Sequence, residues 1–327
     1  MSSIVRVRRV PPVRRLRRPH PSVVVVGDLT LDVVLLPTRP LEHGTDVPGR
    51  VMLRQGGSAA TTARWLGRLG AGSTFVTAVG RDAIGRALMT RLRGDRVVVH
   101  ALRAAGRPTA RIGVVVAPDG ERSFVADRGA ADLLAAGDLR ARWFAGADGV
   151  HLPAYSLIGE PLGGAGRRAV ELGRVAGAVV SVDLASSGPL LADGRAAAVE
   201  LVASVVPDLL FATESEASAL LGSAPAEGLL ALAPVVVVKR GGKGATLLHR
   251  QPGDSGPPLR LEVATRHLAA ADTTGAGDAF DAGFLASWLA SDRADRHRPA
   301  TLRRAVVAGH RAAARQLARP PEELVLA

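Results

Sequence analysis

Short β-branched runs alternate with helical patterns along most of the chain, and this alternation limits the fold more than any other feature. The four valines at 23–26 read as a buried strand of a parallel sheet. From Ser58 to Leu69, apolar side chains recur with helical spacing before a glycine. The same succession continues to two helical patterns at 276–290 and 302–317. Repeated units of this kind predict an α/β fold with a mainly parallel central sheet covered by helices on both faces.

Two segments interrupt the alternation. Residues 37–50 are rich in proline, glycine and charge, which is typical of an excursion from the core. Two alternating stretches, 111–117 and 121–126, flank Pro-Asp-Gly, a combination that predicts an antiparallel hairpin. This hairpin is antiparallel and local, unlike the segments around it.

Composition excludes several classes of protein. The chain has 327 residues, 47% of them hydrophobic, which is enough for a large core. Its apolar runs are far shorter than the roughly 20 residues of a membrane span, and no secretory signal pattern is visible. Because cysteine is absent, the sequence excludes disulfides, thiolate metal sites and a cysteine nucleophile. We expect a cytoplasmic protein without membrane partners.

The net charge of +12 is concentrated at the N-terminus. Residues 1–20 contain seven arginines and no acidic residue, within a Pro/Arg-rich stretch that predicts disorder. The leader could be a nucleic-acid arm, but only 3% of the chain is aromatic and the body does not interleave aromatic with basic residues. A nucleic-acid partner is therefore not favoured. The expected organisation is a disordered leader at 1–21, one domain at 22–318 and a C-terminal tail at 319–327.

The segment DTTGAGDAF, residues 272–280, carries the clearest chemistry. Free N–H groups at a helix start, together with the helix dipole, stabilise an anion, and glycines let it approach the backbone. A carboxylate just beyond such a nest would repel a resting phosphate. It fits if a substrate hydroxyl lies between them: Asp278 accepts the proton while Gly275, Ala276 and Gly277 stabilise charge on the transferred group. The alternative is an acid that only complements the helix dipole after a tight turn.

This segment resembles the C-terminal signature of the ribokinase-like (PfkB) carbohydrate kinase family, and the resemblance extends from about Ser22 to Leu317. It implies a ribokinase-like three-layer fold with a small β-sheet lid over the substrate, formed from about 37–55 and 98–127. It also implies ATP-dependent phosphorylation of an alcohol hydroxyl of a small sugar or sugar derivative. The implied cofactors are ATP and Mg²⁺, with a monovalent cation as a further candidate. A homodimer formed through the lid is the implied assembly.

Two further stretches match the family on the sugar side. GDLTLD, ending in Asp32, is similar to the first strand and turn, and the resemblance implies that Asp32 grips sugar hydroxyls. Read alone, Asp32 could be an Asx-turn cap. QGGSAAT resembles the N-terminal signature and implies that Gly56 and Gly57 let the sugar lie against the backbone. The family usually has Asn where this chain has Thr61, which offers a hydroxyl without an amide's pair of bonds, so sugar preference stays open.

Two stretches match on the nucleotide side. Thr213-x-x-Glu216 resembles an Asn-x-x-Glu segment and implies that Glu216 organises magnesium, with Thr213 in place of the Asn. Read alone, it is a helix capping box. KRGGKG follows a strand and resembles the nucleotide loop, which implies ATP contacts by Lys239, Gly241 and Gly244. The plain alternative is a glycine-rich turn.

Competing signatures for other chemistries are missing: the sequence has no GxxxxGK[ST], HExxH or GxSxG. A nucleoside kinase of the same family stays open and would need an aromatic or apolar wall for the base, for which Tyr155, Phe124 and Trp143 are candidates. A non-catalytic sugar-binding relative is the third alternative, although a binding module has no need of Asp278 beside a glycine nest.

Overall fold

The computed structural model describes residues 20–325 except 118–121, 252, 254–255, 267–271 and 321. The predicted disordered leader, apart from its last two residues, and the tip of the predicted hairpin lie outside the described residues. Within the described part of the chain, no helix is long and apolar enough to cross a membrane.

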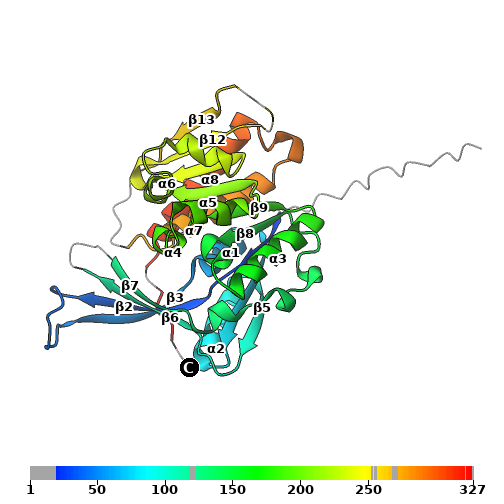
Figure 1. The fold of residues 1–327 in the computed structure, drawn as a ribbon. Helices are drawn as coiled ribbons and strands as arrows, with labels where there is room; N and C mark the ends of the chain where they lie inside the picture. Colours follow the sequence, from blue (N-terminus) through cyan, green and yellow to red (C-terminus); the bar gives the residue numbers. More distant parts are fainter. Residues whose placement is uncertain are drawn as a thin grey trace, which may run out of the picture.

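A large sheet of nine strands forms the centre of the molecule (Figure 1). Its order is β13-β12-β11-β10-β9-β8-β1-β4-β5, and the strands from β11 to β5 are parallel, whereas β12 and β13 are antiparallel. The prediction of a mainly parallel sheet is confirmed. The strands are β1 Ser22–Val26, β4 Gly72–Gly80, β5 Val97–Ala104, β8 Gly149–Pro153, β9 Val179–Asp183, β10 Leu209–Thr213, β11 Val235–Lys239, β12 Ala245–His249 and β13 Leu259–Val263.

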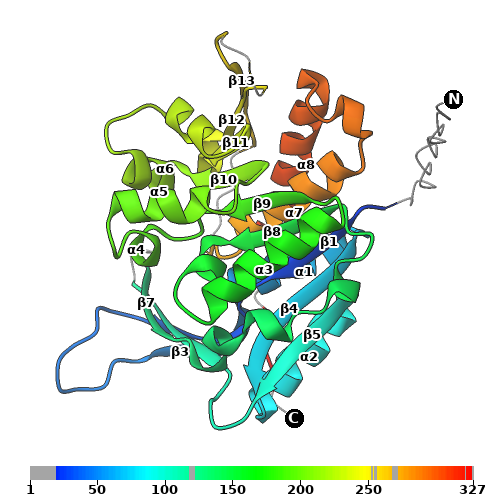
Figure 2. The same cartoon turned by 45° about the vertical axis from the view of Figure 1, so that its right-hand side comes forward.

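Helices cover both faces of this sheet and give three layers (Figures 1 and 2). Alternate valines of β1 face opposite cores: Val23 and Val25 belong to one buried cluster, and Val24 and Val26 belong to the other. The first cluster includes side chains of α1 Ser58–Arg68, α2 Ala83–Gly94, α7 Ala276–Leu289 and α8 Pro299–Leu317. The second includes side chains of α3 Leu162–Val175, α4 Ser187–Leu190, α5 Arg195–Ala203 and α6 Glu214–Leu221.

A separate four-stranded sheet projects from the large one (Figure 1). It consists of β2 Thr30–Pro37, β3 Gly49–Gly56, β6 Ala110–Val116 and β7 Arg122–Asp127, in the order β3-β2-β6-β7. The predicted hairpin is present, because β6 and β7 pair antiparallel. The predicted range 98–127 begins too early, since β5 pairs in parallel with β4 and belongs to the large sheet.

The C-terminal segment packs against the small sheet and the helices α1 and α2. The Leu324 N–H donates to the Leu53 carbonyl of β3 at 2.7 Å, and Leu324 is buried. Glu322 forms ion pairs with Arg64 and Arg68 of α1 and with Arg91 of α2. The end of the chain therefore joins the small sheet to the helical layer.

The strand order reverses next to β1, which lies between β4 and β8. The chain leaves β1 for β4 by way of the small sheet and α1, and it returns to β8 only later. In open α/β sheets, ligands bind in the crevice at the carboxyl ends of the strands at such a reversal. Asp28, two residues after β1, and Tyr155, two residues after β8, both line the pocket found there.

Candidate active site

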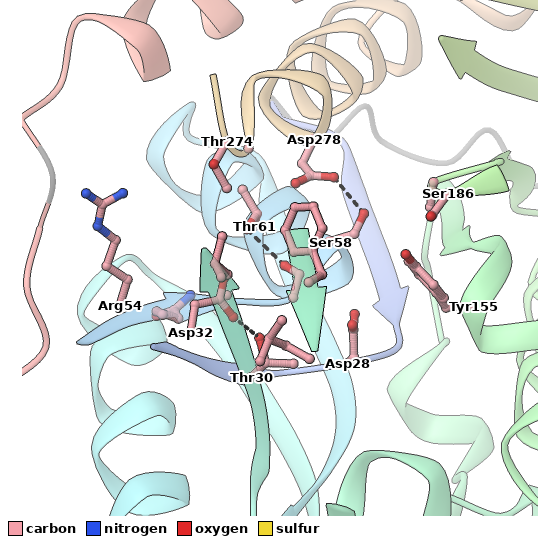
Figure 3. Close-up of a pocket in the computed structure, with 18 of the residues that line it drawn as sticks. Asp28, Thr30, Asp32, Arg54, Ser58, Thr61, Tyr155, Ser186, Thr274 and Asp278 are labelled. Carbon is pink, nitrogen blue, oxygen red and sulfur yellow. Dashed lines mark hydrogen bonds between the residues drawn. The ribbon is translucent and has the colours of Figure 1, made fainter. Parts of the chain in front are cut away.

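A pocket of about 960 Å³ lies between the small sheet and the carboxyl ends of the large sheet. It gathers Asp32, Gly56, Gly57 and Thr61 from the first fifth of the chain with Gly275 and Asp278 from the last fifth. Those six are predicted site residues. Figure 3 shows Asp32, Thr61 and Asp278 among the residues that line the pocket. The other predicted residues do not line this pocket: Ala276, Gly277, Thr213, Glu216, Lys239, Gly241 and Gly244.

Asp278 lies in the first turn of α7 and is half-buried, with its side chain in the pocket wall. Burial raises the pKa of Asp278 to about 7, and a hydrogen bond from the Ser58 hydroxyl, 2.6 Å from Oδ1, acts in the opposite direction. Repulsion by Asp183 raises this pKa further, whereas attraction by Lys239 lowers it. A carboxyl that titrates near neutrality can accept a proton from a bound hydroxyl, which is the property required of a general base.

The backbone before Asp278 forms a turn suited to an anion. Gly275, the N-cap of α7, has a left-handed φ of 75°, a conformation that glycine adopts without strain. The N–H groups of Gly275 and Gly277 donate to none of the described residues, so they can donate to a ligand. The Ala276 N–H instead donates to the Thr273 carbonyl at 3.2 Å. Of the three predicted donors, one is therefore used within the turn.

The two glycines before α1 make room for the Asp32 carboxylate and for the backbone of Asp28. A Cβ at position 56 would lie 2.0 Å from Oδ1 of Asp32, and one at position 57 would lie 2.5 Å from the carbonyl oxygen of Asp28. Burial raises the pKa of Asp32 to about 6, although the Thr30 hydroxyl donates to its Oδ1 at 2.7 Å and opposes this rise. Gly56 is thus required for Asp32 to stand in the pocket wall, and Gly57 is required for the close approach of the Asp28 backbone.

Thr61, at the position where Asn is usual in the family, donates its hydroxyl hydrogen within its own helix turn rather than to the pocket. Its hydroxyl donates to the Gly57 carbonyl at 2.9 Å (Figure 3). Its methyl group lies 3.1 Å from the position that a Cβ on Gly275 would occupy. Thr61 therefore packs α1 against the turn before Asp278, and toward a ligand its oxygen can only accept a hydrogen bond.

A buried ion cluster lies behind this turn. Lys239 Nζ, at the end of β11, is 3.0 Å from Asp183 of β9 and 3.2 Å from Asp281 of α7. Burial disfavours the ammonium, but attraction to these two carboxylates outweighs burial and raises the pKa of Lys239. A Cβ on Gly277 would be 3.4 Å from Nζ, so the positive charge lies next to the turn. Lys239 thus points inward, away from the predicted nucleotide loop.

Sequence reasoning missed Asp183 and Asp281. Asp183 ends the apolar strand VVSVD, and that position at the carboxyl end of a strand was the available signal. Asp281 carried no comparable signal, because it lies inside the helical pattern of α7.

The remaining nucleotide-side residues have local roles in the fold. Thr213 and Glu216 form the capping box: the Glu216 N–H donates to Thr213 Oγ1 at 3.2 Å, and the Thr213 N–H donates to Glu216 Oε2 at 2.7 Å. Gly241 and Gly244 both have left-handed φ values, 54° and 96°. A Cβ at Gly244 would lie 2.2 Å from the Val263 carbonyl oxygen, so the turn after β11 needs glycine there.

Arginines of the small sheet reach the segment before Asp278. From β7, Arg122 donates to the hydroxyls of Thr274 and Thr273 at 2.6 and 2.7 Å. From β3, Arg54 forms an ion pair with Asp272. Sequence patterns did not indicate these contacts, because they join strands and a loop that are far apart along the chain.

A third arginine and two of the three aromatic candidates lie in the pocket. Arg128 is 3.7 Å from Asp28, and its guanidinium lies over the Tyr155 ring, 5.4 Å from the centroid. Tyr155 and Phe124 line the pocket, whereas Trp143 stacks on a histidine outside it. Two of the three side chains named for an aromatic wall are therefore in place.

Comparison with known proteins agrees with this geometry. Residues 20–320 match the family model described as pfkB family carbohydrate kinase. The chain is 33% identical to fructokinase-1 of Oryza sativa subsp. japonica, over 80% of this chain and 81% of that protein. It is 32% identical to a fructokinase of Klebsiella pneumoniae, over 82% of this chain and 85% of that protein.

Solved structures with this fold include several kinases. Adenosine kinase from Sinorhizobium meliloti matches with a TM-score of 0.78 and 23% identity, covering 94% of this chain and 97% of that one. Fructokinase from Vibrio cholerae, bound to fructose, ADP and calcium, matches with a TM-score of 0.73 and 24% identity, covering 92% and 94%. An Escherichia coli protein described as a ribokinase II, in complex with ATP and Mg²⁺, matches with a TM-score of 0.74 and 21% identity, covering 92% and 94%. Pocket, fold and family model agree, and this chain belongs to the pfkB family of carbohydrate kinases.

Proposed function

We propose that this carbohydrate kinase transfers the γ-phosphoryl group of ATP to a hydroxyl of a small sugar, with fructose the first acceptor to test. The observation that supports this most is Asp278, a half-buried carboxylate with a pKa near 7 that lines the pocket and follows two glycine N–H groups that donate to none of the described residues. The choice of fructose follows the relatives that share 30% identity or more, which are named fructokinases.

In the proposed reaction, Asp32 and the backbone at Gly56 and Gly57 bind hydroxyls of the sugar and orient it. Asp278 accepts the proton of the reacting hydroxyl as its oxygen attacks phosphorus. The N–H groups of Gly275 and Gly277 donate to oxygens of the transferred group, on which charge accumulates. Closure of the small sheet would exclude water, so that ATP is not hydrolysed.

The residues present suit ATP and magnesium. Gly275 and Gly277 offer N–H groups that have no acceptor within the described part of the chain, and the Lys239 ammonium adds positive charge directly behind them. Magnesium commonly binds through one or two carboxylates, waters and substrate phosphates, so Glu216 would suffice to hold its waters, and bound magnesium would neutralise phosphate charge. Gly241 and Gly244 would shape the turn that contacts the nucleotide. A requirement for a monovalent cation stays a prediction.

A panel assay tests the proposal. ADP release from Mg-ATP would be measured against fructose, other hexoses, pentoses, sugar acids and nucleosides, with Asp278→Asn beside the natural protein. We expect turnover with fructose or a related sugar, and turnover about 10²–10⁴-fold slower with the variant. Turnover with a nucleoside alone would favour the nucleoside kinase alternative. ATP binding without turnover of any acceptor would favour a non-catalytic relative.

A further inference from the structure

Helix α1 holds Asp278 from two sides. Ser58, its first residue, donates its hydroxyl hydrogen to Asp278 Oδ1 at 2.6 Å (Figure 3). One turn further along, the Thr62 hydroxyl lies 3.5 Å from the Asp278 backbone carbonyl. Gly57 has a left-handed φ of 96° and directs the chain into α1, which places Ser58 against the first turn of α7. The contact is therefore set by backbone geometry on both helices.

The hydrogen bond from Ser58 makes the two carboxylate oxygens of Asp278 inequivalent. Oδ1 accepts the Ser58 hydrogen, whereas Oδ2 accepts no hydrogen bond from the described residues. Ser58 and Asp278 both line the pocket. A hydroxyl donates more strongly to an ionised carboxylate than to a neutral carboxyl, so this bond favours the ionised form. Because the only hydrogen of Ser58 is used, its oxygen can only accept hydrogen bonds from a ligand.

We propose that Ser58 is a positioning residue for the general base: its hydroxyl keeps Asp278 ionised and turned so that Oδ2 faces the acceptor hydroxyl. This inference rests on the proposed function, in which Asp278 is the base. It adds a residue that touches neither phosphate nor the transferred proton and yet sets the pH range in which the base is available.

Charged groups on the elements around Asp278 also influence the pH range in which its carboxyl is ionised. Asp28 after β1, Asp183 at the end of β9 and Asp281 on α7 repel its negative charge, whereas Lys239 at the end of β11 attracts it. Burial is the largest influence and raises the pKa of Asp278 to about 7, while the Ser58 hydrogen bond is the largest opposing one. The other groups stay unchanged when only the hydroxyl is removed, so Ser58→Ala isolates its effect.

The first test is the pH profile of kcat/KM for the natural protein, Ser58→Ala and Ser58→Thr. We expect the acid limb of Ser58→Ala to move up by about one pH unit, since a hydrogen bond to a charged group is worth about that much. Activity below neutrality then falls about tenfold, and the loss shrinks as pH rises. Ser58→Thr keeps the hydroxyl and should restore the limb.

Ser73→Ala is the matched control. Ser73 lies on β4 and is buried, and its hydroxyl donates to the carbonyl of Ala63 on α1, the helix that begins with Ser58, without contacting Asp278. This control should leave the acid limb in place. An unmoved limb in Ser58→Ala, or an equal shift in the control, overturns the proposal.

A second measurement does not depend on activity. Titration of the Asp278 carboxyl by ¹³C NMR, assigned with Asp278→Asn, should give a higher pKa in Ser58→Ala than in the natural protein. Equal values overturn the role of Ser58 even if no acceptor is found. Conversely, full activity of Asp278→Asn refutes the proposed function, whereas loss of activity in that variant with an unchanged Ser58→Ala profile refutes only the positioning role.

Discussion

Asp278 is an ionisable carboxyl inside the protein, and its pKa makes stability depend on pH. Below the unfolded value of 3.8, both states hold the proton. Between 3.8 and about 7, the unfolded state has released the proton while the folded state keeps it, so stability falls as pH rises. Above pH 7, the folded protein carries the full cost of the buried charge, at most about 4 kcal/mol.

We predict that Asp278→Asn stabilises the protein while removing the base. The gain in melting temperature should be several degrees at pH 8 and smaller at pH 5, because at pH 5 the folded carboxyl is already neutral. Thermal unfolding at the two pH values measures this, with Asp46→Asn, in an exposed loop, as the control. An equal gain in melting temperature at both pH values, or a loss of stability at pH 8, would contradict the raised pKa of Asp278.

At the scale of elements, the small sheet contacts the segment before Asp278 from both its edge strands, β3 through Arg54 and β7 through Arg122. We predict that Arg122→Ala loosens closure, lowers kcat/KM about tenfold and raises the share of ATP that is hydrolysed. Sugar phosphate and ADP would be quantified in the same reaction.

Arg111→Ala is the control, because Arg111 pairs with Asp127 within the same hairpin and not with residues 272–274. Equal ratios of sugar phosphate to ADP in Arg122→Ala and the natural protein would show that this contact does not control access of water.

Local signals explain which elements the sequence predicted well. Helix α7 was expected over 276–290 and spans Ala276–Leu289, because its glycine start and apolar repeat are both local. The capping box at Thr213 was predicted for the same reason. By contrast, β5 was assigned to the small sheet, since strand membership depends on pairing with β4.

In the candidate site, too, the sequence indicated residues with local patterns but not contacts between distant parts of the chain. The residue types at Asp278, Asp32 and the glycines were evident from spacing and from family resemblance. The inward direction of Lys239 was not, because it depends on Asp183, 56 residues away along the chain. The contact between Ser58 and Asp278 joins residues 220 positions apart and likewise follows only from the packing of α1 on α7.

At the scale of the whole molecule, the small sheet exposes apolar side chains on its outward face. Val51 and Val125 are 62% and 74% exposed, and strand register places them on the same face. Exposed apolar surface and open strand edges are typical of an interface. We predict a homodimer formed through this sheet.

Sedimentation equilibrium should show a dimer that Val125→Asp dissociates. Val175→Asp, at another exposed valine, on α3, should leave it intact. A natural protein that is monomeric at all concentrations would contradict the predicted assembly.

The most direct test of the central claim follows the phosphoryl group itself. ATP labelled with ³²P at the γ position would be incubated with Mg²⁺ and the sugar that gives turnover, using the natural protein and Asp278→Asn, and ATP affinity would be measured for both. We predict label in the sugar phosphate with the natural protein, and transfer slowed by about 10²–10⁴-fold in the variant with unchanged ATP affinity. Transfer by Asp278→Asn at the natural rate would contradict the assignment of Asp278 as the base.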